Sequence, residues 1–208
     1  MESCKIVIAG VGGQGTLLAS RMLANAAIKS GLSVKIGETY GMAQRGGPVT
    51  GHIQIGGTPL NPQIRIGEAD ALLAFEPAEG LRRGVTYLKD DGLALVNTRK
   101  VAPVEVISGR TSYPEERRMM DLLSRVTEGI VRFDATALAE EAGDPIATNV
   151  VMIGALTASG ILPYAKEEIL KVLREDLSPR YLHINIRAFN LGKETFIKMA
   201  DQKSLHRE

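Results

Sequence analysis

The sequence predicts an α/β protein in which helices cover both faces of a mostly parallel sheet. Short apolar runs alternate along the chain with segments of helical periodicity, which is typical of strands joined by crossover helices. The first apolar run ends in a glycine-dense turn, as strands of parallel sheets often do. The chain has 208 residues and 44% hydrophobic content, enough for one buried core without disulfides. The expected architecture is a three-layer, Rossmann-like fold that also contains one short antiparallel hairpin.

The expected strands are apolar runs bounded by turn residues. Continuous apolar runs without polar alternation indicate parallel strands that are buried on both faces. One pair of runs alternates instead, and residues 56–59 (Gly-Gly-Thr-Pro) supply a turn between its members, which predicts the hairpin. The expected strands begin at Cys4 and then cover residues 32–36, 52–55, 63–66, 71–75, 93–96, 105–108 and 130–134.

The expected helices show apolar residues at helical spacing between recognisable start and stop signals. In the first of them, Leu17, Leu18, Met22 and Leu23 share one face, and Gly31 ends the helix as a C-terminal glycine. Proline, asparagine and Ser-Pro signals open or break the later ones. The expected helices cover residues 14–30, 77–88, about 114–126, 149–161, 166–176 and 183–199.

Composition narrows the class of protein. Residues 1–200 are expected to form a single domain, followed by a polar C-terminal tail over 201–208. The formal net charge of +1 gives no field of the kind that nucleic-acid-binding proteins use. No apolar run reaches the ~20 residues that a membrane-spanning helix needs, and the N-terminus enters a strand without a signal peptide. We therefore expect a cytoplasmic protein that binds neither nucleic acid nor membranes.

The reactive side chains exclude several kinds of site. Cys4 is the only cysteine, so this chain can build neither an internal disulfide nor an iron–sulfur cluster, which takes four thiolates. His52, His183 and His206 lack metal-site spacing. The sequence has no Gly-x-Ser-x-Gly elbow and no Walker loop, which excludes the common hydrolase and P-loop classes. No catalytic or metal-binding residue is therefore assigned.

The turn after the first strand is the main candidate for a binding site. Gly10, Gly12 and Gly15 have the G-x-G-x-x-G spacing, and Gly13 and Gln14 lie between them. A helix that starts near Gln14 would direct its free N–H groups toward a phosphate. A tight connection in a parallel sheet also uses glycine, so the motif alone leaves a purely structural role open.

A second loop bears on the kind of ligand. Glu38 follows the second expected strand at about the distance where dinucleotide-binding proteins place the acidic residue that holds the ribose. The loop after it carries one aromatic residue, one fixed cation and two glycines, namely Tyr40, Arg45, Gly46 and Gly47. This loop argues against a simple nicotinamide site, although it does not exclude one.

A series of short motifs runs in order along nearly the whole chain. These are residues 10–15 (GVGGQG), 40–41 and 45–47 (YG and RGG), 69–70 with Phe75, 95–97 (LVN), 134–136 (DAT), Asn149 with 154–155, and Asn185 with 188–189 and Gly192. In this order and spacing the chain resembles the gamma-type subunits of 2-oxoacid:ferredoxin oxidoreductases. Residues 42–47 and 97–114 are more similar to the beta subunits of the indolepyruvate branch than to the pyruvate or 2-oxoglutarate branches.

The resemblance implies a role in oxidative decarboxylation. In this family a 2-oxoacid adds to thiamine diphosphate and loses CO2, iron–sulfur clusters pass the electrons to ferredoxin, and coenzyme A receives the acyl group. Thiamine and the clusters belong to a partner subunit. The chain would then be a non-thiamine-binding oxidoreductase subunit (EC 1.2.7 class) that is inactive alone, and its family is associated with coenzyme A capture. The gamma subunit of a pyruvate or 2-oxoglutarate enzyme remains an alternative.

The expected binding residues are those of the two loops. A glycine turn suits the phosphates of coenzyme A, while Arg45 suits either a phosphate or a carboxylate of the partner subunit, and Tyr40 either an adenine or the subunit interface. Two other interpretations stay open: an NAD(P)-binding dehydrogenase domain, and a scaffold without a nucleotide. An isolated chain is expected to form a homodimer through surface meant for its partner. The expected cofactor-binding residues are Gly10, Gly12, Gly13, Gln14, Gly15, Tyr40, Arg45, Gly46 and Gly47.

Overall fold

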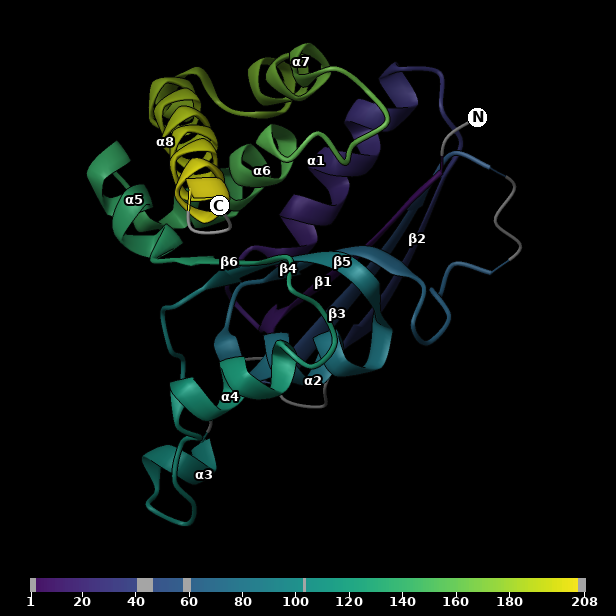
Figure 1. Cartoon of the computed structure of the whole chain (residues 1–208). Helices are drawn as coiled ribbons and strands as arrows, with labels where there is room; N and C mark the ends of the chain where they lie inside the picture. Colours follow the sequence, from purple (N-terminus) through teal and green to yellow (C-terminus); the bar gives the residue numbers. More distant parts are fainter. Residues whose placement is uncertain (1–2, 41–46, 58–60, 103, 206–208) are drawn as a thin grey trace.

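A six-stranded mixed sheet lies between two helical layers, which confirms the predicted fold class (Figure 1). The structure, a computed structural model, describes residues 3–40, 47–57, 61–102 and 104–205. The strand order is β2-β3-β1-β4-β5-β6. Strands β1, β4, β5 and β6 run parallel, whereas β3 is antiparallel to both β1 and β2. The strands are β1 (Cys4–Val11), β2 (Val34–Tyr40), β3 (Pro48–Ile55), β4 (Ala69–Ala74), β5 (Leu88–Asn97) and β6 (Ile130–Phe133).

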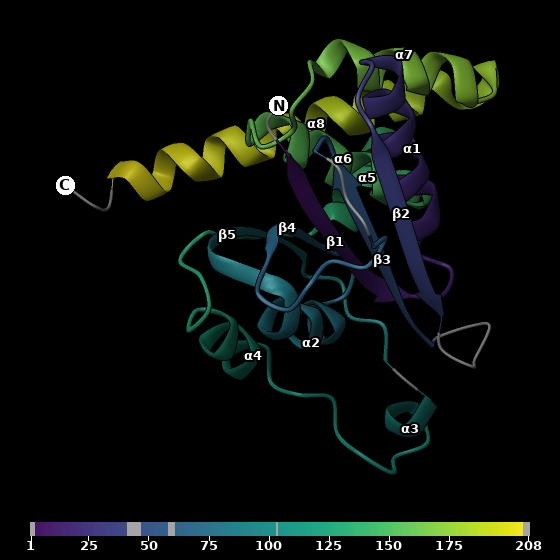
Figure 2. The ribbon, with the colours of Figure 1, turned by 90° about the vertical axis from the view of Figure 1, so that its right-hand side faces the viewer.

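The two faces of the sheet carry unequal helical layers. One face is covered by α1 (Thr16–Lys29), α5 (Ala135–Ala142), α6 (Thr148–Ala158), α7 (Lys166–Asp176) and α8 (Pro179–Leu205). The other face is covered by α2 (Pro77–Tyr87) and α4 (Glu116–Leu123). Two short elements complete the described chain: α3 (Val104–Ile107), which projects from the body, and the 3-10 turn η1 (Pro145–Ala147) (Figure 2).

Two hydrophobic clusters follow from this layering. The larger one joins the sheet to α1, α6 and α8 and includes Phe75 and Phe189, which are fully buried. The smaller one lies under α2 and α4 and includes Val7 and Leu72. Adjacent strand residues such as Leu72 and Leu73 enter opposite clusters, because successive side chains of a strand point to opposite faces. This is why the central strands are apolar throughout.

The predicted hairpin between residues 52–55 and 63–66 is wrong, although the sheet does contain an antiparallel pair of neighbouring strands. Strand β3 pairs with β2, which precedes it, and residues 63–66 form no strand. Ile64 is nonetheless buried in the smaller cluster while Ile66 is 77% exposed. The buried and exposed residues of this segment therefore alternate as the sequence suggested, but the segment is a loop that packs on the sheet and not a strand.

Two further corrections concern the region between β5 and α6. Residues 105–108 were expected to be a strand, whereas the structure has the one-turn helix α3 there. A short apolar run cannot distinguish strand from helix by periodicity, and in the sheet β6 lies directly beside β5. Helix α5 was not predicted. Its signal was Asp134, which caps it by accepting the N–H of Ala137 at 2.8 Å.

Helix α8 continues to Leu205 and so includes residues 201–205 of the segment expected as a polar tail. Its far end projects past the body of the molecule (Figure 2). Among the described residues, no helix is both long and apolar enough to cross a membrane.

Candidate functional site

The candidate site lies at the carboxyl edge of the parallel strands. Strands β1, β4 and β5 end side by side, with Ala9 opposite Ala74 and Ala74 opposite Val96. The glycine turn follows β1, Glu76 follows β4, and Asn97 ends β5. Because ligands of open α/β sheets bind outside the carboxyl ends of the strands, this edge is where a binding site is expected.

Three of the four glycines in the turn have clearly different roles. A Cβ on Gly10 would lie 2.7 Å from Gln14 Oε1 and 2.9 Å from Thr16 Cγ2, so Gly10 permits tight packing inside the turn. Gly13 has φ = +100° and nothing within 4 Å of where its Cβ would stand, so its backbone is open to an approaching group. Gly15, with φ = +75°, is the N-cap of α1. The helix thus begins at Thr16, slightly later than predicted.

Gln14 and Asn97 tie three strand ends together through one carbonyl. Gln14 Oε1 accepts the N–H of Val11 at 2.9 Å, and its Nε2 donates to the Phe75 carbonyl at 3.0 Å. Asn97 Nδ2 donates to the same carbonyl at 3.2 Å. Asn97 Oδ1 also accepts the N–H of Ala135 at 3.0 Å, which fixes the start of α5. These bonds give both side chains a positioning role within the edge.

The described end of the second loop, Gly47, reaches the glycine turn at this edge. Strand β3 places Pro48 opposite Val11, and the N–H of Gly12 donates to the Gly47 carbonyl at 2.9 Å. Tyr40 is the last residue of β2, one strand further out. The side chain of Tyr40, together with Arg45 and Gly46, lies outside the described residues.

Two helix N-termini converge beside the turn. A Cβ on Gly15 would lie 3.3 Å from Asn149 Nδ2, and Asn149 is buried in the first turn of α6. Gly15 has no side chain to cap α1, and neither α1 nor α6 has an acidic residue in its first turn. The start of α1 therefore presents positive dipole charge that favours an anionic group. At the start of α6, in contrast, Asn149 Oδ1 accepts the N–H of Val150 at 2.9 Å, and Asp144 caps the preceding turn η1.

A buried carboxylate lies at the end of β4. Glu76 is 2% exposed and caps α2 by accepting the N–H of Glu79 at 2.9 Å. The hydroxyl of Tyr113 donates to its other oxygen. Burial and this carboxylate raise the pKa of Tyr113, so the phenol stays protonated. Neither residue was predicted; the available signal was Glu76 directly before Pro77, a helix-start pattern.

The geometry argues against a dinucleotide site. Dinucleotide-binding sheets place the second strand beside the first, whereas β3 separates β2 from β1 here. Glu38 pairs with Gly51, which in turn pairs with Ile8, so Glu38 is two strand spacings (roughly 10 Å) away from β1. The expected ribose contact is therefore poorly placed.

Two observations concern reactive and metal-ligating side chains among the described residues. Cys4 is buried, and burial raises the pKa of its thiol to about 12, so it is a poor nucleophile. No group of three or more His, Cys, Asp or Glu side chains among the described residues is placed to hold a metal ion.

Comparisons with known proteins agree with this picture. The sequence profile described as "Pyruvate ferredoxin/flavodoxin oxidoreductase" matches residues 5–195. The chain is 41% identical to the indolepyruvate oxidoreductase subunit IorB of Pyrococcus horikoshii, over 92% of this chain and 95% of that protein. It is 31% identical to the pyruvate/ketoisovalerate oxidoreductases common subunit gamma of Thermococcus kodakarensis, over 91% of this chain and 93% of that protein.

Solved structures share the fold. The gamma subunit of a keto/oxoacid ferredoxin oxidoreductase from Geobacter sulfurreducens superposes with a TM-score of 0.67 at 25% identity, covering 94% of this chain and 99% of that chain. The 2-oxoglutarate:ferredoxin oxidoreductase of Magnetococcus marinus, with 2-oxoglutarate, coenzyme A and succinyl-CoA bound, gives a TM-score of 0.71 at 19% identity. It covers 95% of this chain but only 32% of that longer chain, and it bears on the fold alone.

Proposed function

Because the chain belongs to the pyruvate ferredoxin/flavodoxin oxidoreductase family and is a subunit of a 2-oxoacid:ferredoxin oxidoreductase, we propose that its enzyme is of the indolepyruvate type and that its glycine turn binds coenzyme A. The subunit role agrees with the resemblance read from the motifs. The proposal adds three things to this subunit role: the class of 2-oxoacid, coenzyme A as the ligand, and a thiamine-binding partner subunit.

The substrate branch is supported by the relatives. The 41% identity to IorB exceeds the 31% identity to the pyruvate/ketoisovalerate subunit gamma over nearly the same share of the chain. An aryl-pyruvate is accordingly the proposed substrate. We place its pocket on the thiamine-binding partner subunit, as the family resemblance implies.

The ligand is supported by one observation above all, the open backbone at Gly13 beside the uncapped N-terminus of α1. Coenzyme A carries a pyrophosphate and a 3′-phosphate, and a glycine turn with a helix N-terminus suits such groups. A ligand can approach the backbone of Gly13, because nothing lies within 4 Å of where its Cβ would stand. It cannot approach Gly10 in the same way, because the side chains of Gln14 and Thr16 fill that space. Arg45 in the second loop is the proposed cation for a phosphate.

In the proposed complex, the partner subunit and this chain have different chemical roles. Thiamine diphosphate on the partner subunit supplies the carbon nucleophile for decarboxylation, and iron–sulfur clusters there carry electrons to ferredoxin. This chain binds and orients the acceptor thiol of coenzyme A at the edge of that site. Gln14 and Asn97 hold the turn rigid through the Phe75 carbonyl, and a rigid turn loses less entropy when it binds.

The test is steady-state kinetics of the complex co-purified under anaerobic conditions with tagged chain. We expect activity with indolepyruvate that exceeds activity with pyruvate or 2-oxoglutarate. Gly13→Ala should raise the KM for coenzyme A about tenfold, because a side chain at φ = +100° strains the turn and obstructs its open face. The KM for the 2-oxoacid should stay unchanged.

Gly31→Ala is the matched control. Gly31 has φ = +75°, nothing within 4 Å of a Cβ, and lies at the opposite end of α1, so it carries similar strain away from the site. If Gly13→Ala and Gly31→Ala raise the KM for coenzyme A equally, backbone strain alone explains the rise. If Gly13→Ala lowers assembly but leaves the KM for coenzyme A unchanged, the scaffold role is correct instead.

A further inference from the structure

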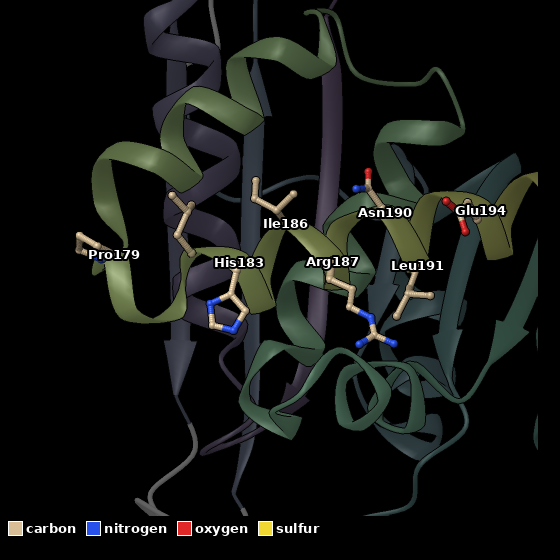
Figure 3. A pocket seen from close by; sticks show the side chains of 8 residues that line it. Pro179, His183, Ile186, Arg187, Asn190, Leu191 and Glu194 are labelled. Atoms are coloured by element: carbon tan, nitrogen blue, oxygen red, sulfur yellow. The ribbon is translucent and has the colours of Figure 1, made fainter.

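The outer face of α8 carries four exposed side chains, those of His183, Arg187, Asn190 and Glu194. The helix packs by its inner side against α6 and, less extensively, α5. Its opposite side bears a shallow groove of about 590 Å³ whose lining comes from α8 alone (Figure 3). This face holds none of the residues of the candidate site, so it calls for a separate explanation.

The groove has the form of a helix-packing surface. Leu182, Ile186 and Asn190 follow one another at intervals of four, and Arg187 and Leu191 form the neighbouring row. Ile186 and Asn190 point to one side of the helix in Figure 3, and Arg187 and Leu191 point to the other. Rows of this spacing are the ridges by which helices pack, and the space between two of them accepts a ridge of another helix.

The charges on this face are self-complementary. Arg187 and Glu194 are seven residues apart, about two turns or ~10.5 Å along the axis. If a second α8 runs antiparallel about a two-fold axis between Asn190 and Leu191, each Arg187 meets the Glu194 of the other copy. The amide of Asn190 then lies next to its own copy, where a polar residue at a helix contact specifies register.

The ion pair that Arg187 makes with Glu141 in its own chain competes only weakly with a contact to Glu194 of another copy. Its Nη2 lies 3.4 Å from Glu141 Oε1, and both side chains are more than half exposed. Exposed pairs of this kind contribute about 0–1 kcal/mol. The guanidinium can also reach a second carboxylate, since it carries five N–H donors.

We propose that the outer face of α8 forms a symmetric, antiparallel contact between two copies of this chain, with paired Arg187–Glu194 ion pairs about a central Asn190. The apolar part of the contact comes from Leu182 and from the exposed parts of Ile186 and Leu191, which also pack against the larger hydrophobic cluster. This inference does not depend on the substrate or ligand proposed above. It assigns a surface to the homodimer that the sequence led us to expect.

The test is the molar mass of the full chain by light scattering over a concentration series. We expect a dimer for the wild type. Arg187→Glu and Glu194→Arg should each raise the dimer dissociation constant about tenfold or more, because each puts like charges opposite one another twice. The double variant should restore dimerisation, because the two charges simply exchange places.

Arg65→Glu is the matched control, since Arg65 lies in the loop before β4, outside α8, and its side chain is 85% exposed. It should leave the dimer intact. Circular dichroism of each variant checks that α8 still folds. A monomeric wild type at every concentration, or a double variant no better than the two single ones, would overturn the proposal and leave the face to another chain.

A cross-link gives a second, independent measurement. Cys4 is the only native cysteine and is buried, so Asn190→Cys introduces the one accessible thiol of the chain. Under mild oxidation it should form an intermolecular disulfide, whereas the highly exposed Ile66→Cys should not. Cross-linking at both positions, or at neither, would contradict the proposed contact.

Discussion

At the scale of single residues, the glycine turn shows how one motif mixes structural and binding roles. Gly10 is required by packing, since a Cβ there meets Gln14 and Thr16. Gly13 is required by its φ and faces open space. Gln14 closes the turn with both ends of its amide. The motif predicted that glycines were needed, but the neighbours of each position decided the reason.

Gln14 offers a direct test of the positioning role. Gln14→Ala leaves the N–H of Val11 without its 2.9 Å acceptor and removes one of two donors from the Phe75 carbonyl. We expect a loss of about 1–3 kcal/mol in the free energy of unfolding by urea. Gln14→Glu should recover only the bond to Val11, because a carboxylate cannot donate to Phe75. A loss below about 0.5 kcal/mol for Gln14→Ala would contradict this role.

At the scale of elements, α6 and α8 cross unusually closely. A Cβ on Gly154 of α6 would lie 2.1 Å from the Phe189 carbonyl oxygen, and one on Gly192 of α8 would lie 1.9 Å from that of Val151. The two helices thus place a glycine against the backbone of each other. This reciprocal contact orients α8, and through it the outer face that we assign to self-association.

Gly192→Ala is therefore expected to destabilise the protein strongly. The added methyl overlaps backbone, which cannot move as a side chain would, so the helices must separate; we expect roughly 3 kcal/mol or more by chemical denaturation. Lys193→Ala, one position along the same helix and half-buried, should cost less than about 1 kcal/mol. Similar losses for the two changes would argue against the close crossing.

At the scale of the whole molecule, strand β3 decides the character of the fold. By pairing antiparallel between β1 and β2, it brings Gly47 to the glycine turn and moves Glu38 away from it. It also buries His52, whose Nδ1 accepts the N–H of Ile64 at 3.4 Å. The rings of His52 and Tyr87 form a T-shaped pair with their centroids 4.8 Å apart. Strand β3 thus contributes both to the candidate site, through Gly47, and to the core, through His52.

The burial of His52 predicts a pH dependence of stability. Burial, helped by the charge of Arg83 on α2, lowers the pKa of His52 below its ordinary value of 6.5. The unfolded chain then binds more protons than the folded one, so stability is complete above pH 6.5 and falls as pH drops through the folded pKa. Glu79, whose pKa burial raises, acts in the opposite direction.

The measurement compares the wild type with His52→Gln in urea unfolding at several pH values between about 5 and 8. Glu79 is present in both proteins, so its effect cancels in the difference between them. We expect the advantage of the wild type to shrink as pH falls. A constant difference across this range would show that His52 does not become charged on unfolding.

Sequence patterns located most of the elements for identifiable reasons. The continuous apolar runs of β4 and β5 are buried on both faces, and α7 was predicted at its observed bounds because its start and stop signals are local. The strand expected at 63–66 was wrong, since Ile64 is buried by a loop that packs on the sheet. The strand expected at 105–108 is a helical turn, because four apolar-rich residues carry no decisive period.

By itself, the sequence determined the α/β class, the glycine turn after the first strand, the absence of cluster-forming cysteines and the family, because composition, turn chemistry and motif order are properties of the chain alone. Only the tertiary structure decided that β3 lies between β1 and β2, that Gly47 meets Gly12, and that Gln14 and Asn97 share the Phe75 carbonyl. Strand order and cross-strand hydrogen bonds join residues far apart in sequence. No local pattern encodes such pairings, because they depend on which surfaces the folded sheet brings into contact.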